Sequence, residues 1–275
     1  MSATTMKTLL ICHEGAALHR EGIARWLASF SELAGVVVLR EPPSAAWRRT
    51  RRELRRVGPI RFADVIAFRL YYRLFLAARD EAWKQRTLRK LCELSAVPDR
   101  TPVLYARSPN TPEAERFIKD RSPDVVVTFC KVLLKPQIWS IPRHGAFALH
   151  PGICPEYRNA HGCFWALARG DVERVGMTLL RIDAGIDTGP IYGYYRYPYD
   201  EVAESHIVIQ HRVVLENLDA LREKLVAICA GRATPIDTSG RTSATWGQPR
   251  LTSYFKWKYR ARKGRVSEVH RAALS

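Results

Sequence analysis

Short, continuous apolar runs separated by helical stretches constrain the fold of this chain more than any other feature. The clearest runs are Lys7–Cys12, Gly35–Arg40, Asp124–Cys130 and Gly145–His150. Runs of this length without polar alternation are typical of strands buried on both faces, as in a parallel sheet covered by its crossover helices. Their alternation with helical stretches predicts an α/β fold with a doubly wound, mainly parallel, Rossmann-like sheet.

Weaker signals extend this pattern along the chain. We expect further strands at Pro102–Arg107, Val175–Ile182 and Pro190–Tyr199, and helices at His19–Phe30, Thr111–Arg121 and His206–Ala230. With 47% apolar residues the chain can bury a sizeable core, so global disorder is excluded. We predict two units: a catalytic domain over 1–230 and a basic, aromatic C-terminal extension over 231–275.

Two basic segments stand out from the expected sheet. The first is a helical insertion over residues 47–78, in which Pro59 is expected to begin a new helix, followed by another helix over Asp80–Leu94. The second is Tyr254–Arg265, where lysines and arginines alternate with aromatic residues. Such segments can bind nucleic acid or a membrane surface. The plainer explanations stay open: a solvated face on a packed helix for the first segment, and a packed terminal segment or a frayed tail for the second.

The net charge and the cysteines bound the cellular context. A formal charge of +17 attracts anions, whether nucleic acid, nucleotide phosphates or an anionic membrane, and charge alone does not choose among them. The six cysteines form no CxxC pair, and the early apolar run Leu9–Cys12 is too short for a signal peptide. We therefore expect reduced thiols, a cytoplasmic location and no transmembrane segment.

The residues best suited to chemistry lie between His150 and Gly189. His150 ends an expected strand, at the edge where open α/β sheets bind ligands, and imidazole can move a proton near neutral pH. The later loop Asp183–Pro190 brings Asp187 to a similar edge, where a carboxylate would orient the imidazole and stabilise its protonated form. Spacing alone leaves a purely structural histidine as the alternative.

The same window contains an ordered run of short motifs. They read Leu149–Arg158, Trp165–Leu167, Gly170–Asp171, Val175–Thr178 and Asp183–Gly189. In this order they resemble the formyltransferase family that uses 10-formyltetrahydrofolate, which includes methionyl-tRNA, glycinamide ribonucleotide and sugar-nucleotide N-formyltransferases. The resemblance is strong over about 123–199, weaker over 6–122 and absent from the tail.

The resemblance implies residue roles. His150 and Asp187 fall on the catalytic histidine and aspartate of the family. The family's folate-binding segments fall on Lys131, Val132, Leu133 and Leu134, on Gly152, Ile153, Cys154 and Pro155, and on Ile182, Asp183, Ala184, Gly185 and Ile186. The co-substrate would be 10-formyltetrahydrofolate, and no metal is expected at the site.

One departure from the family pattern affects the expected chemistry. The family carries asparagine two residues before the histidine, where it is thought to hold the formyl oxygen, and this chain has Ala148 there. Losing one such donor costs about 100- to 1,000-fold in rate. Asn159 or His161, on the loop that follows, are candidate substitutes for the missing donor.

These observations predict formyl transfer to a primary amine of a small, phosphorylated or nucleotide-linked acceptor such as an amino sugar. Because residues 231–275 are too short and too basic for the β-barrel that follows the catalytic domain in methionyl-tRNA formyltransferases, a tRNA acceptor is disfavoured. Ala148 keeps open a folate-binding protein or a formyltetrahydrofolate hydrolase. A basic nucleic-acid or membrane protein without chemistry would leave the motif window unexplained, and the sequence leaves the oligomeric state and a peripheral membrane contact open.

Overall fold

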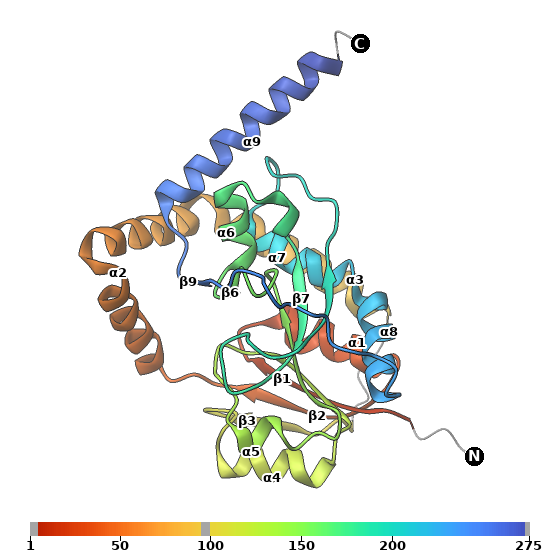
Figure 1. Ribbon diagram of the computed structural model, residues 1–275. Coiled ribbons are helices and arrows are strands. Elements are labelled where there is room, and N and C mark those ends of the chain that lie inside the picture. The colour runs from red at the N-terminus through yellow and green to blue at the C-terminus, as the bar shows by residue number, and fades with distance from the viewer. Residues whose placement is uncertain (1–4, 95–99, 273–275) are drawn as a thin grey trace.

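One seven-stranded sheet organises the molecule, and the computed structural model describes residues 5–94 and 100–272 of the chain (Figure 1). The strand order is β3-β2-β1-β4-β5-β7-β8. The parallel part comprises β1 (Lys7–His13), β2 (Glu32–Leu39), β3 (Val103–Ala106), β4 (Val125–Phe129) and β5 (Gly145–His150). Antiparallel β7 (Met177–Arg181) and β8 (Ile191–Tyr195) extend it. The expected α/β fold with a mainly parallel, Rossmann-like sheet is confirmed.

The apolar runs form central strands because both of their faces are buried. In β1, Leu10 and Cys12 belong to one hydrophobic cluster, while Leu9 and Ile11 belong to the cluster on the opposite face, and all four are fully buried. Successive side chains of a strand point to opposite faces, so a strand between two helical layers needs apolar residues at every position.

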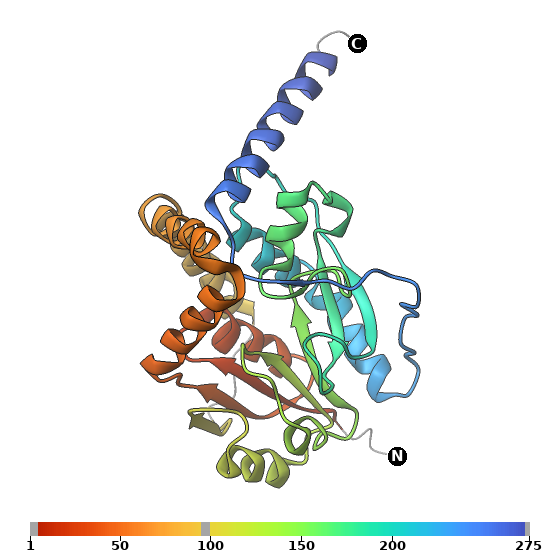
Figure 2. The ribbon, with the colours of Figure 1, turned by 60° about the vertical axis from the view of Figure 1, so that its left-hand side comes forward.

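Helices cover the two faces unequally. On one face lie α4 (Pro112–Arg121) and α5 (Pro136–Trp139), the former capped by the Thr111 side chain and begun by a proline. The other face carries the larger cluster and the helices η1 (Leu18–Ile23), α1 (Ala24–Ala28), α6 (Gly162–Arg169), α7 (His206–Leu215) and α8 (Leu218–Cys229) (Figures 1 and 2). The single helix expected over 206–230 is two helices, divided at Glu216 and Asn217.

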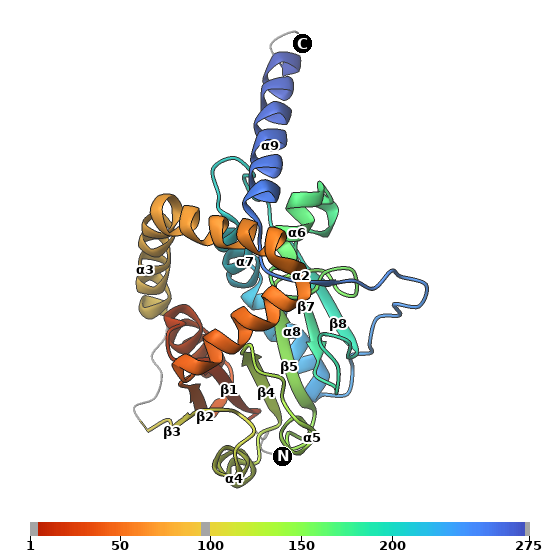
Figure 3. The same cartoon turned by 90° about the vertical axis from the view of Figure 1, so that its left-hand side faces the viewer.

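The basic insertion forms a bent helical arm beside this layer (Figure 3). It consists of α2 (Pro43–Tyr71), η2 (Tyr72–Leu76) and α3 (Ala77–Leu94). Gly58 interrupts α2 with φ 77° and ψ 168°, directly before Pro59. A left-handed φ favours glycine, and proline suits a first helical turn, so the helix begins anew here as expected.

The C-terminal segment first packs against the body of the protein, and its last helix then extends away from it. Residues 231–250 are mostly irregular, with β9 (Thr245–Trp246) pairing to β6 (Arg158–Asn159) in a second, two-stranded sheet. The helix α9 (Leu251–Ala272) then buries Tyr254 and Trp257 in the larger core cluster, while its far end projects from the molecule (Figures 1–3). The two-unit division at residue 230 stays a prediction.

Candidate active site

His150 lies at the carboxyl end of β5 with only 8% of its surface exposed. Its Nε2 is 2.9 Å from the carbonyl oxygen of Tyr157, and its Nδ1 is 3.6 Å from Oδ2 of Asp187. Burial alone would lower the pKa of the ring, but the Asp187 carboxylate, the Cys154 side chain and the Tyr157 carbonyl raise the pKa of His150 to about 10. The ring is therefore an imidazolium at neutral pH.

Asp187 reaches this position because its loop runs back along the sheet. β7 is antiparallel to β5, so the loop after β7 starts near Phe147 and must return toward His150. Asp187 has a left-handed φ of 50°, and its Oδ2 accepts a 2.7 Å hydrogen bond from the backbone N–H of Asn159. The Asp183 carboxylate stabilises the same loop by accepting hydrogen bonds from the Gly185 N–H and the Thr188 hydroxyl.

A small cavity of about 70 Å³ lies beside this pair. Its walls come from β4, β5, β7 and the two loops that follow β4 and β7. The lining residues are Thr128, Cys130, Val132, Leu133, Leu134, Ala148, Leu180, Ile182, Asp183, Gly185 and Asp187. Leu133, on the loop after β4, and Ile182, on the loop after β7, both line it, so apolar side chains border the cavity on both sides.

The structure separates the residues expected to contact folate into two groups. Val132–Leu134, Ile182, Asp183 and Gly185 line the cavity, whereas Ala184 and Ile186 lie on the same loop without lining it. Lys131 is held beside the cavity by a hydrogen bond from its N–H to His13 Nε2. The Gly152–Pro155 segment does not line the cavity and instead contacts β7. The Thr178 hydroxyl donates to the Gly152 carbonyl and accepts from the Cys154 N–H, which fixes this loop onto β7.

The structure gives a local reason for glycine at position 152. A Cβ at this position would lie 2.7 Å from the Tyr157 carbonyl oxygen, 2.8 Å from His150 Nε2 and 2.9 Å from the Gly162 Cα. Two of these three atoms are backbone and cannot move aside easily. The loop can thus bring the Tyr157 carbonyl to His150 only if residue 152 has no side chain.

The two candidate substitutes for the missing asparagine lie elsewhere. The Asn159 amide donates a 2.5 Å hydrogen bond to the Trp246 carbonyl, and the Nδ1 of His161 has no hydrogen-bond partner. Burial, followed by the charges of Lys131 and Arg69, lowers the pKa of His161 to about 4, so its ring is neutral. Neither residue lines the cavity that Ala148 borders, and both assignments stay predictions.

Thr128 is a polar residue of this cavity that motif reasoning missed. It pairs directly with Ala148 across β4 and β5, and both residues line the cavity. Its side chain is 4% exposed, so its hydroxyl is a donor in a desolvated place next to the altered position. The register of two strands reveals this relation, which no motif around His150 contains.

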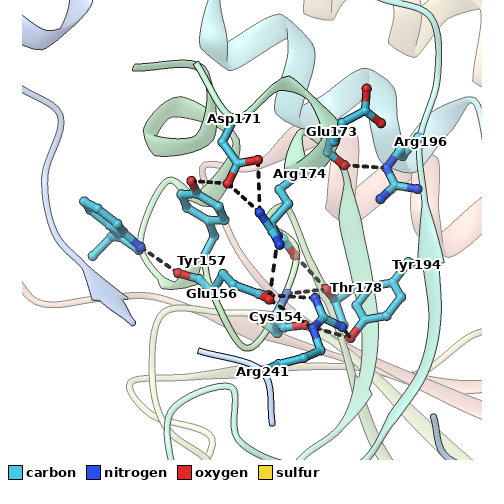
Figure 4. A network of polar contacts seen from close by, with 12 residues as sticks. Cys154, Glu156, Tyr157, Asp171, Glu173, Arg174, Thr178, Tyr194, Arg196 and Arg241 are labelled. Carbon is cyan, nitrogen blue, oxygen red and sulfur yellow. Dashed lines mark hydrogen bonds and ion pairs between the residues drawn. The ribbon is translucent and has the colours of Figure 1, made fainter. Parts of the chain in front are cut away.

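Residues 241–248, which we call the strap, hold the loop that carries the Tyr157 carbonyl (Figure 4). Trp246 stacks between Tyr157 and Trp165, with ring centroids at 5.6 and 5.0 Å, and its Nε1 donates to the Glu156 carbonyl at 2.8 Å. The carboxylate of Glu156 accepts two hydrogen bonds from Arg241, at 2.9 and 2.7 Å. The strap therefore fixes residues 156–159, which contact both His150 and Asp187.

A second set of contacts extends this network toward α6 (Figure 4). Arg174 forms ion pairs with Glu156 at 3.6 Å and with Asp171 at 3.0 Å, and Asp171 also accepts a 2.8 Å hydrogen bond from the Tyr157 hydroxyl. Tyr157 is thereby held at its ring and at its hydroxyl. Within the described residues there is no group of three or more histidine, cysteine, aspartate or glutamate side chains that could hold a metal ion.

Comparison with known proteins places this geometry in a family. Residues 77–223 match the formyl transferase model, which is more than half of the chain. Methionyl-tRNA formyltransferases from Sorangium cellulosum and Myxococcus xanthus are 35% and 32% identical to this chain, over 46% and 51% of its length. The chain spans less than half of the length of these relatives, 42% and 45% respectively.

Solved structures share the fold at low sequence identity. A sugar N-formyltransferase from a Shewanella species matches with a TM-score of 0.52 and 13% identity, over 93% of this chain and 88% of that chain. Glycinamide ribonucleotide transformylase 1 from Symbiobacterium toebii matches with a TM-score of 0.51 and 16% identity, over 84% of this chain and 95% of that chain. With the family match over residues 77–223, these findings show that the chain belongs to the formyl transferase family.

Proposed function

We propose that this protein transfers a formyl group from 10-formyltetrahydrofolate to a primary amine of a small, anionic acceptor such as a nucleotide-linked amino sugar. The observation that carries the proposal is the pair of buried His150 and half-buried Asp187 beside a cavity walled by the two loops assigned to folate. The site fits a folate because Leu133 and Ile182 offer apolar contacts for a flat ring. At about 70 Å³ the cavity would hold only part of such a ligand.

His150 and Asp187 divide the work of acyl transfer between them. The 3.6 Å separation of Nδ1 and Oδ2 exceeds a good hydrogen bond, which leaves the Nδ1 proton available to an oxygen placed at the cavity. There the imidazolium stabilises the negative charge that develops on the formyl oxygen. Asp187 keeps the ring charged and accepts the proton of the attacking amine, directly or through water. The bond between the formyl carbon and the folate nitrogen then breaks, and that nitrogen takes up a proton as tetrahydrofolate leaves.

Thr128 takes over the oxyanion contact that asparagine makes in the family. Thr128 pairs with Ala148 across β4 and β5, and both residues line the cavity. A preorganised donor in a desolvated site stabilises developing charge without reorganisation at the moment of reaction.

Formamide production from amino-sugar nucleotides and 10-formyltetrahydrofolate tests the function, measured by mass spectrometry with His150→Ala as the inactive control. Calorimetry with a non-reactive formylfolate analogue tests the folate site separately. Analogue binding without any formamide product, across amino-sugar nucleotides and tRNA, would favour the second candidate, a folate-binding protein or a formyltetrahydrofolate hydrolase. Ala148 at the cavity wall is the observation that favours this second candidate, and formate release without an acceptor would distinguish the hydrolase. Absence of analogue binding would remove both candidates.

A further inference from the structure

The arm helices carry an exposed surface of apolar and basic side chains that has no part in the proposed formyl transfer. Ile66, Leu70 and Leu74 follow one another at helical spacing along α2 and η2, and they are 43%, 57% and 65% exposed. Phe75 and, on α9, Tyr259 are 67% and 72% exposed. Surface hydrophobic residues normally occur singly, so a gathering of this kind marks an interaction site.

Aromatic contacts join the two helices beside these exposed side chains. We call Ile66, Leu70, Leu74, Phe75 and Tyr259, together with the groove between the helices, the arm surface. The Tyr71 ring contacts both Phe75 and Phe255, with centroids at 5.0 and 5.2 Å, and Tyr254 is 5.5 Å from Tyr71. A groove of about 360 Å³ lies between the helices. Its lining residues are Tyr71, Tyr254, Phe255, Lys258, Tyr259 and Arg262.

Basic side chains flank the exposed apolar stripe. Arg69 and Arg73 lie beside it on α2 and η2, and Lys256 and Arg262 lie on α9, all of them exposed. None of these four forms an ion pair with an acidic side chain within residues 5–94 and 100–265. The chain as a whole carries a formal charge of +17, so the arm surface offers uncompensated positive charge next to apolar side chains.

We propose that the arm surface binds an anionic phospholipid bilayer, with the apolar stripe at the level of the headgroups and the flanking cations on lipid phosphates. Interfacial helices combine an apolar face that carries aromatic residues with lysine and arginine, as the arm surface does. A second copy of the chain is a poor partner because a symmetric contact would bring like charges together. Nucleic acid explains the cations but not the exposed Ile66, Leu70 and Leu74, since bases stack on aromatic rings.

This attachment differs from a membrane span. Within the part of the chain that the structure describes, no helix is long and apolar enough to cross a membrane. Binding therefore depends on anionic lipid and weakens as salt screens the attraction.

Flotation of the full chain with vesicles tests the proposal. We expect binding to vesicles of mixed phosphatidylglycerol and phosphatidylcholine, at least about tenfold stronger than to phosphatidylcholine alone. The double variant Leu74→Glu with Phe75→Glu should lower this binding at least about tenfold, because it places two negative charges at the lipid surface. Val226→Glu is the matched control, since Val226 is 41% exposed on α8 and outside the arm surface.

Three outcomes would overturn the proposal. They are equal binding to neutral and anionic vesicles, unchanged binding by the double variant, and tight binding of tRNA that displaces the protein from vesicles. Dimerisation in solution that the double variant abolishes, without any vesicle binding, would assign the arm surface to a second copy. Both altered side chains are exposed, so circular dichroism should show an unchanged fold, and formyl transfer to a soluble amine should also be unchanged.

Discussion

The candidate site and the arm surface differ in how their side chains are held. Loop 156–159 is fixed by the strap on one side and by Asp171 and Arg174 on the other, and nearly every polar group there has a partner. On the arm surface, Leu74 and Phe75 are more than 60% exposed, and the flanking cations form no ion pair with the acidic side chains that the structure describes. A site that must hold charges in place needs such fixed contacts, whereas a surface that meets a fluid partner does not.

The largest effect is expected at the paired charges. His150→Ala and Asp187→Asn should each lower kcat about 1,000- to 10,000-fold, because one removes the donor to the developing charge and the other removes the group that keeps it protonated. Steady-state formamide production measures both, and thermal unfolding at neutral pH checks that the variants fold. Near-normal kcat in either variant would mean that other residues of the cavity carry out the chemistry.

The pKa of His150 provides a second test of the candidate site. Its pKa is about 10 in the folded protein and near 6.5 in an unfolded chain, so its stabilising contribution is complete below pH 6.5 and is lost as pH rises through 10. Asp187→Asn removes the largest of the contributions that raise this pKa, while burial, which lowers it, remains, so the pKa of the ring should decrease from about 10. Histidine NMR signals recorded from pH 5 to 11, with His150→Gln for assignment, check both values.

Thr128 should show the next largest effect. Thr128→Val keeps the shape of the side chain and removes its hydroxyl, so kcat should decrease about 100-fold while KM for the folate changes little. Adding Ala148→Asn to this variant should restore part of the activity, because an amide at position 148 reaches the same cavity. Thr128→Ser, which keeps the hydroxyl, is the control, and an active Thr128→Val enzyme would exclude the assignment.

The strap should affect catalysis through the residues it positions. Trp246→Ala removes the stacking on Tyr157 and the hydrogen bond to the Glu156 carbonyl, so kcat should decrease about tenfold. The alkaline limb of the pH profile should also move to lower pH, since the Tyr157 carbonyl and Asp187 would hold the His150 proton less firmly. Trp246→Phe should recover much of kcat, and Ser239→Ala, on the exposed turn before the strap, should change neither value.

The smallest effect is expected on the arm surface. Phe75→Glu should change the free energy of unfolding by less than ~0.5 kcal/mol, because its side chain is mostly exposed. Trp257→Ala, on the buried face of α9, should cost about 3–5 kcal/mol by the same denaturant titration. A large loss of stability in Phe75→Glu would mean that the arm surface is part of the core and not a docking site.

Most of the fold could be predicted from local sequence patterns. The strands at Lys7–His13 and Gly145–His150 were predictable because buried parallel strands need unbroken apolar residues, and the helix break at Gly58 because the next residue is proline. The division of 206–230 into two helices was missed because apolar periodicity continues across Asn217. Periodicity reports which face is buried, and it does not report a change in helix direction.

The candidate active site could be predicted only in part from the sequence. The motifs placed His150 and Asp187 near the same edge, and the structure brings them to 3.6 Å. The contact between Thr128 and the position of Ala148 depends on the pairing of two strands, and the support from Trp246 comes from a residue 87 positions after Asn159. Such contacts follow from register and from the path of the chain, which no local pattern encodes.

The sequence by itself determined the parallel core, the family motifs and the excess of positive charge, because each of these is a property of local order or of composition. Tertiary structure alone decided that the residues after 230 include a strap that contacts residues 156–159, and that α9 buries Tyr254 and Trp257 while exposing Tyr259. The physical reason is that burial is set by what packs against a side chain. A basic, aromatic segment contains residues for both a core and a surface, and only packing against α2 and α6 distributes them between the two.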